Sequence, residues 1–128
     1  FRSGCVGETG SAVVAAEQLA LATDPAVRAA LGEIVADEAR HAELAWLTVA
    51  WALEVGGEPV LRAVTDALRD ATHDAPEAGD VLAPGLRAEL LASPNRLGRD
   101  EAVAVIARAV DEVVRPCAAR LLGSSCSM

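Results

Sequence analysis

Apolar positions in the first half of the chain recur every three or four residues, the spacing of a helix stripe that faces other helices. Between two such stripes, Thr23-Asp24-Pro25 combines an N-cap side chain with a proline at the first helical position, which predicts a turn. We therefore expect antiparallel helices over residues 6–22 and 25–55, the second ended by Gly56-Gly57. The stripe positions are Cys5, Glu8, Ala12, Ala15, Leu19 and Ala22, then Val27, Leu31, Ile34, Glu38, His41, Ala45, Thr48 and Ala52.

The second half of the chain predicts shorter elements. Apolar residues four apart indicate a helix over residues 59–71, and the glycines, prolines and acidic residues of 72–85 indicate a loop. A short helix over 86–91 and a turn over 93–98 precede a last helix over 100–122, in which Pro116 predicts a kink, and a frayed tail over 123–128. The apolar seam of the last helix reads Val103, Ile106, Val110, Val113 and Cys117.

Composition agrees with a helical bundle. The 128 residues are 52% hydrophobic but only 2% aromatic, and alanine-rich interiors let helices approach closely. No run of β-branched alternation and no Asn-Gly hairpin signal occurs. We predict one all-α domain over residues 1–128, with a helix hairpin over 1–57 and accessory helices and the tail over 58–128.

Charge and cysteine content narrow the function classes. The net charge is −8, from 19 acidic and 11 basic residues without a basic cluster, which argues against nucleic-acid binding. No apolar run is long enough for a membrane span, and the first residues resemble neither a signal peptide nor a translation start. We therefore expect a fragment or processed product, cytoplasmic rather than exported. Three cysteines without CxxC spacing argue against structural zinc and a disulfide framework: Cys5, Cys117 and Cys126.

Three ionisable residues, Glu8, Glu38 and His41, occupy apolar stripe positions. Glu8 lies about 14 residues before the turn and Glu38 about 13 after it, so both lie about 20 Å from the turn at one level of the hairpin. Buried carboxylates need a partner, because desolvating a charge costs several kcal/mol. A metal ion is one such partner, and an arginine paired with Glu38 (for example Arg40) or with Glu8 is the alternative.

Other residues with metal-binding chemistry are left out of the site. Cys5 shares the face of Glu8, but a buried structural thiol is the better interpretation. Glu112 has no second ligand three residues later, and His73 falls in the expected loop, where a solvated histidine is the usual case. The tryptophans, Trp46 and Trp51, are five residues apart and are interpreted as packing anchors.

A Glu on one helix and a Glu-x-x-His on the next is the half-site of dinuclear carboxylate bundles. The segments Gly4–Thr9, Asp24–Arg28 and Asp37–Trp46 resemble a bacterial group of ferritin-like proteins, strongly over residues 4–54 and weakly at residues 115–117. This resemblance implies a ferritin-like bundle in which Glu8 is a metal ligand, Glu38 a carboxylate able to bridge two metals and His41 the terminal nitrogen ligand. It also implies that Asp37 accepts the free ring N–H of a histidine from the opposing half.

Such proteins carry two half-sites, and this chain holds one. The resemblance therefore implies either a homodimer or a missing N-terminal half that completes four carboxylates and two imidazoles. These ligands suit iron first and manganese second, with dioxygen or peroxide as co-substrate in oxidase, ferroxidase or hydroxylase chemistry. The alternative function is a metal-free interaction or dimerisation module that uses an apolar face including Trp46 and Trp51. An iron-storage shell ranks below both.

Overall fold

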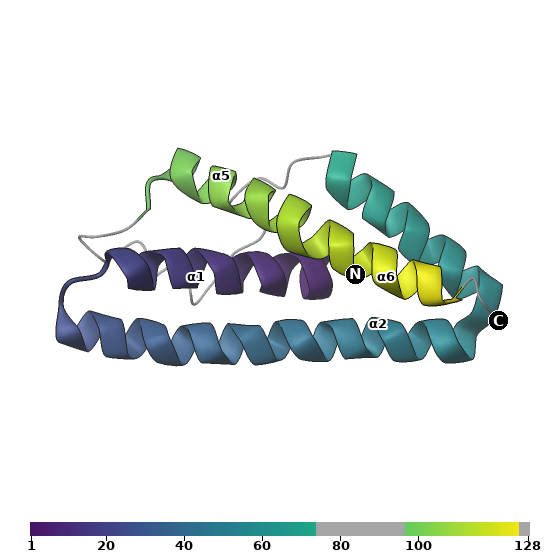
Figure 1. The fold of residues 1–128 in the computed structure, drawn as a ribbon, viewed down its shortest axis with the longest axis horizontal. Helices are drawn as coiled ribbons and strands as arrows, with labels where there is room; N and C mark the ends of the chain where they lie inside the picture. Colours follow the sequence, from purple (N-terminus) through teal and green to yellow (C-terminus); the bar gives the residue numbers. More distant parts are fainter. Residues whose placement is uncertain (74–96, 126–128) are drawn as a thin grey trace.

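The computed structural model describes residues 1–73 and 97–125, which form a bundle of helices (Figure 1). No strand occurs in these two stretches, which confirms the all-α class. The short helix expected over 86–91 and the tail residues 126–128 lie outside the described residues, as does most of the expected loop. In chain order the elements are η1 (Arg2–Glu8), α1 (Thr9–Leu21), α2 (Pro25–His73), α5 (Arg99–Ala109), η2 (Val110–Val114) and α6 (Arg115–Ser125), with η marking π-helical turns.

The turn between α1 and α2 is held from both sides, which confirms the predicted hairpin. The Asp24 carboxylate accepts two backbone N–H groups of the first turn of α2 at 2.8 and 3.0 Å, as an N-cap does. The Arg28 guanidinium then donates to the carbonyls of Leu19 and Ala22 at 2.9 and 2.8 Å. Because backbone groups at both helix ends are hydrogen-bonded here, the turn determines which residues of α1 lie opposite which residues of α2.

Gly57 ends the first helical arm of α2, over residues 25–56, which confirms the helix end predicted at residues 56–57. Its backbone has φ 56° and ψ −149°, a conformation that glycine adopts without a side-chain clash. The chain turns sharply there, and a second arm over residues 58–73 runs back above the first (Figure 1). This arm contains the helix expected over 59–71, and it continues to His73, where the loop was expected.

Two apolar clusters hold the bundle together. The first joins α5 to the turn-proximal half of the hairpin, and an ion pair between Arg108 and Glu17 links α5 to α1 at its edge. The second joins η1, η2 and the returning arm of α2, with Phe1 set edge-on against Trp46 at 5.7 Å between ring centroids. The buried members are Val14, Ala22, Leu31, Val105 and Ile106 in the first cluster, and Val6, Ala71, Val110 and Val114 in the second.

The last helix keeps its predicted seam only as far as Val110. Beyond it Val114 is fully buried, whereas Val113 is exposed. The π-helical turn η2 explains the change, because a π turn holds an extra residue and so advances the buried face by one position. Pro116 follows directly and has no N–H to donate to the preceding turn. The irregularity expected at Pro116 is therefore present, as a widened turn before it.

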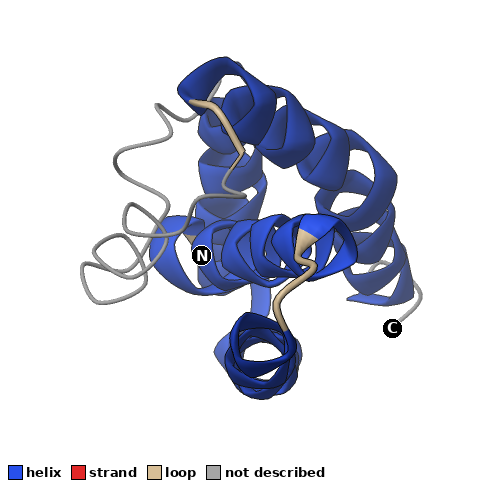
Figure 2. Ribbon diagram, turned by 90° about the vertical axis from the view of Figure 1, so that its left-hand side faces the viewer, coloured by secondary structure: helices blue, strands red, loops and turns tan. Residues whose placement is uncertain are grey.

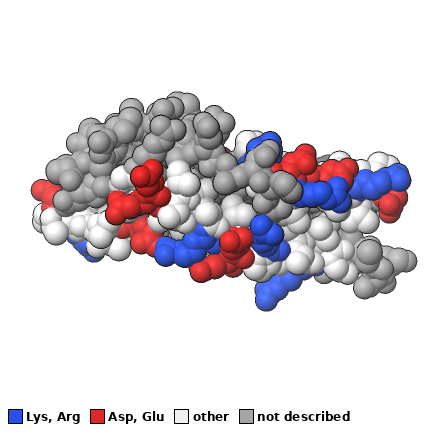
Figure 3. Space-filling model, turned by 90° about the horizontal axis from the view of Figure 1, so that it is seen from above, with Lys and Arg blue, Asp and Glu red and all other residues white. Residues whose placement is uncertain are grey.

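The first arm of α2 forms one edge of the bundle. In both Figure 1 and the end-on view of Figure 2, the other described helices lie on one side of it. Among the described residues, no helix combines the length and apolar character that crossing a bilayer requires. On the face shown in Figure 3, acidic and basic side chains are interspersed.

Candidate metal centre

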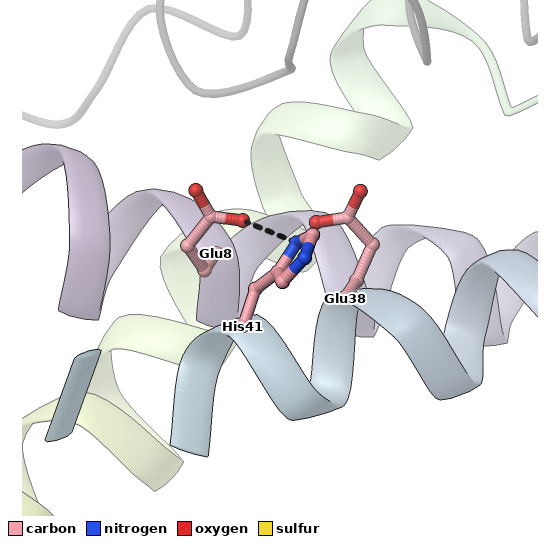
Figure 4. A group of neighbouring side chains, drawn as sticks. All are labelled: Glu8, Glu38 and His41. Atoms are coloured by element: carbon pink, nitrogen blue, oxygen red, sulfur yellow. Dashed lines mark ion pairs between the residues drawn. The ribbon is translucent and has the colours of Figure 1, made fainter. Parts of the chain in front are cut away.

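Glu8, Glu38 and His41 come together between η1 and α2, as the count from the turn predicted. Glu8 ends η1, and Glu38 and His41 lie one turn apart on α2 and point toward it (Figure 4). Each offers one ligand atom, and these atoms all lie within 4.8 Å of one another. The Nδ1 atom of His41 is 3.8 Å from Oε2 of Glu8. That these residues bind a metal stays a prediction.

Contacts of residues near Glu8 in the chain fix its position along α2. The indole N–H of Trp46 donates to Oγ1 of buried Thr9 at 3.2 Å, and the other side of this indole contacts Phe1. Trp46 is therefore a packing anchor, as expected, and it faces the inside of the bundle. Because η1 is clamped at both ends against α2, the Glu8 side chain is held opposite the Glu-x-x-His pair.

Glu38 has an unusual electrostatic position. Its Oε2 atom has almost no contact with solvent and no hydrogen-bond partner among the described residues. Burial raises the pKa of the Glu38 carboxyl above its ordinary value, and the adjacent Glu8 raises this pKa further. A buried polar atom left without a partner costs about 1–3 kcal/mol. A cation between the two carboxylates offsets this cost, so the donor set fits a metal ion.

Arg40 does not form the ion pair with Glu38 that was the alternative to a metal ion. This guanidinium pairs with Asp37 at 2.9 Å on the exposed side of α2, away from Glu38. Glu8 has His41 as its near ionisable neighbour. Asp37 itself is exposed, and its predicted contact with a histidine of an opposing half stays a prediction. The Glu38 carboxylate therefore lacks the arginine that would make this cluster a structural ion pair.

His41 is less buried than its stripe position predicted. Its side chain is 55% exposed, and Thr48, two turns along the same stripe, is exposed as well. The physical reason is that the buried side of α2 is centred on other residues, including Leu31 and Leu53. His41 and Thr48 lie at the rim of that face, and no described helix covers this rim. The expected core position of His41 is wrong for this single chain, and the cluster is open on one side.

A cavity of about 450 Å³ lies beside the open side of the cluster. Glu8 and His41 form part of its wall, and Cys5, Ala45 and Val49 supply apolar lining. Sequence reasoning placed Ala45 on the right stripe but did not predict a cavity, because the lining depends on how η1 approaches α2. The hollow gives a small molecule access to both the imidazole and a carboxylate.

Three residues were left out of the predicted site. Cys5 is a free thiol and is buried, as predicted, and burial raises its pKa to about 11. It is therefore a neutral thiol at physiological pH. Glu112 is exposed on η2. His73 ends α2, and only its backbone is described.

The fold and the cluster define an all-α protein with a two-carboxylate, one-imidazole candidate site. Searches of protein-family models, of curated proteins and of solved structures each found no match to this chain. The ferritin-like resemblance therefore depends on the residue pattern alone and stays a prediction.

Proposed function

We propose that Glu8, Glu38 and His41 bind iron, with manganese as the second choice, as one half of a ferritin-like dinuclear carboxylate centre. The buried Oε2 of Glu38 is the observation that carries this proposal, because no hydrogen-bond donor contacts it and its carboxylate lies beside that of Glu8. Carboxylate oxygens and an imidazole nitrogen suit these metals. Two charged carboxylates beside each other repel, and a cation between them removes this repulsion.

Each side chain has a distinct role in this proposal. By the ferritin-like resemblance, Glu38 would be the carboxylate shared by two metals, and one of its oxygens lies within 4.8 Å of ligand atoms of Glu8 and His41. His41 supplies the terminal nitrogen from the exposed rim, and Glu8 supplies the ligand of the opposite helix. When bound, iron supplies redox chemistry with dioxygen or peroxide. The chain contributes the anionic ligands and the adjoining cavity, where a substrate has access to the site.

The open side of the cluster supports a site completed from outside the described residues. Three ligands are few for two metals, and the exposed rim at His41 leaves room for more. The completing carboxylates and imidazole come either from a second copy or from an N-terminal half that precedes this segment. The reaction class we propose is oxidase or ferroxidase chemistry at the completed centre.

Elemental analysis tests the proposal. Protein purified without added metal is compared with E38Q, which keeps the side-chain shape but removes the charge, and with E43Q, a matched exposed glutamate on the same helix. We expect iron or manganese near one ion per chain in the wild type and in E43Q, and a loss in E38Q. Folded wild-type protein that holds no metal and refuses added iron and manganese overturns the proposal.

The alternative of a metal-free interaction module has one observation in its favour. Trp46, which was expected on the interaction face, is turned inward, but Trp51 is exposed together with neighbouring leucines. This exposed face does not require the metal site to be empty, so the two functions are compatible.

A further inference from the structure

The cavity beside the candidate centre is elongated along the line where η1 meets α2. On α2 its wall includes His41, Ala45 and Val49, which are four residues apart and span about 12 Å at about 1.5 Å per residue. On η1 the wall runs in the opposite direction, from Glu8 beside His41 to Phe1. The cavity therefore has two ends, one at the metal ligands and the other at Phe1 and Val49.

The base of the cavity is closed by a close contact between the two elements. A Cβ atom added to Gly4 would lie 3.1 Å from the Cβ atom of Ala45, so η1 and α2 touch at the middle of the cavity. Leu44 and Thr48, which are exposed, line the outer side. The cavity is therefore open toward solvent, and its volume of about 450 Å³ lies in the range of small-molecule sites.

The two ends of the cavity differ in chemistry. At one end the Glu8 carboxylate and the His41 imidazole point toward each other (Figure 4), and both offer hydrogen-bonding atoms. At the other end, the side chains of Phe1 and Val49 are apolar. A ligand that lies along the cavity therefore meets polar groups at one of its ends and apolar groups over the rest of its length.

The remaining polar groups of the described wall change this picture little. The Thr48 hydroxyl donates to the backbone carbonyl of Leu44 at 2.8 Å, so its proton is already used within the helix. Cys5 is a buried, neutral thiol, which packs as a small apolar group. Ser3 supplies a further hydroxyl, but its residue is exposed and lies at the solvent side.

The charges of the wall favour an uncharged ligand. No lysine or arginine belongs to the described wall, so an anion has no side-chain cation to pair with. A cation would compete with the proposed metal for Glu8, which is the wall's carboxylate among the described residues. A charged group placed against the apolar end loses its hydration without gaining a partner.

We infer that this cavity binds a small, uncharged organic molecule with an apolar body and one polar end. The polar end lies beside Glu8 and His41, and the body follows Ala45 and Val49. As a substrate assignment, this inference rests on the proposed metal function. It favours oxidase chemistry on an organic substrate over ferroxidase chemistry, because the described wall beyond Glu8 offers no further carboxylate to guide a ferrous ion inward.

Titration of metal-free protein with 1-hexanol, followed by backbone NMR signals, tests the inference. V49F fills the apolar end, whereas V55F makes the same change at a residue that is 65% exposed and outside the cavity wall. We expect saturable shifts at Gly4 and Ala45 in the wild type and in V55F. In V49F, with unchanged helical circular dichroism, the dissociation constant should rise about tenfold or more.

The same titration has outcomes that overturn the inference. A wild type without saturable shifts does so, as does a V49F protein that binds 1-hexanol as tightly as V55F. Hexanoate or hexylammonium that binds the wild type as tightly as 1-hexanol overturns the uncharged class. Intermolecular NOEs test the direction, because the methylene beside the hydroxyl should contact the His41 ring and the terminal methyl should contact Val49. The reverse order contradicts the proposed orientation.

E38Q separates this inference from the proposed metal function. Glu38 is not part of the described cavity wall, so E38Q is expected to lose the metal and to bind 1-hexanol within about twofold of the wild type. Wild-type protein that binds 1-hexanol but refuses iron and manganese overturns the metal function and supports the cavity as a binding site. Wild-type protein that holds metal but does not bind 1-hexanol overturns the present inference and leaves the metal function standing.

Discussion

The two opposite sides of the first arm of α2 both carry apolar residues at helical spacing but have very different environments. On one side, Leu31 is buried in the cluster that joins the hairpin to α5, with Val27 and Ile34 packed against it. On the other side, about 160° around the helix, Leu44, Leu47 and Trp51 are exposed. The difference lies in the partner, because α1 packs along the first side and no described element packs against the second. Glu38 lies on the covered side, and His41 lies at its edge.

The largest effect is expected from cavity formation in the core that covers Leu31. I106A removes a side chain that is buried between α5 and the hairpin and should lower the free energy of unfolding by about 2–4 kcal/mol. L47A, on the exposed side of the first arm, should change this free energy by less than about 0.5 kcal/mol. Urea unfolding followed by circular dichroism measures both. Equal losses at the two positions would show that the side with Leu47 is covered.

The second effect concerns Cys5, which is buried although it lies beside the open cavity. Burial raises its pKa from 9.0 to about 11, so the folded state favours the neutral thiol. The stability due to this preference is complete below pH 9.0 and is lost as pH rises toward 11. At about 1.4 kcal/mol per pKa unit, the loss reaches about 2 kcal/mol. Unfolding measured between these pH values should show this decline in the wild type but not in C5A.

A smaller effect, about 1 kcal/mol, is expected at Glu38, near the edge of the covered side. In metal-free protein, E38Q should raise the free energy of unfolding at pH 7, because it removes a poorly solvated charge beside Glu8. The raised pKa of Glu38 means that protonation favours the folded state, so this gain should shrink as pH falls through that pKa. Thermal unfolding at several pH values checks both statements. With iron or manganese added, the order reverses, since the wild type alone binds the metal.

The smallest effect is expected at the turn, which sets the level of the two helices. D24A removes the acceptor of two backbone N–H groups and should cost about 0.5–1 kcal/mol. D66A, an exposed aspartate in the returning arm of α2, is the control and should cost less. A fall in metal affinity in D24A without loss of helix content would show that the turn controls the level of Glu8 against Glu38.

Much of the hairpin and of the candidate site was predictable because helix geometry is regular. The capping signal at Asp24 marked the turn, and a constant rise per residue placed Glu8 opposite Glu38. Gly57 was predicted as a break, but only the structure shows that the helix bends there and returns. The last helix shows most clearly where prediction from a helical repeat fails. A single π turn before Pro116 moved burial from Val113 to Val114, and a constant repeat cannot predict such a shift.

By itself, the sequence determined the helical class, the turn at residues 23–25 and which residues share a face, because these follow from local capping and a constant helical repeat. Tertiary structure decided which of those faces are covered. Apolar residues at helical spacing are buried at Leu31 and exposed on the opposite face at Trp51, since burial depends on which face another element packs against. For the same reason, the structure alone placed His41 at an open rim and left Oε2 of Glu38 buried without a partner.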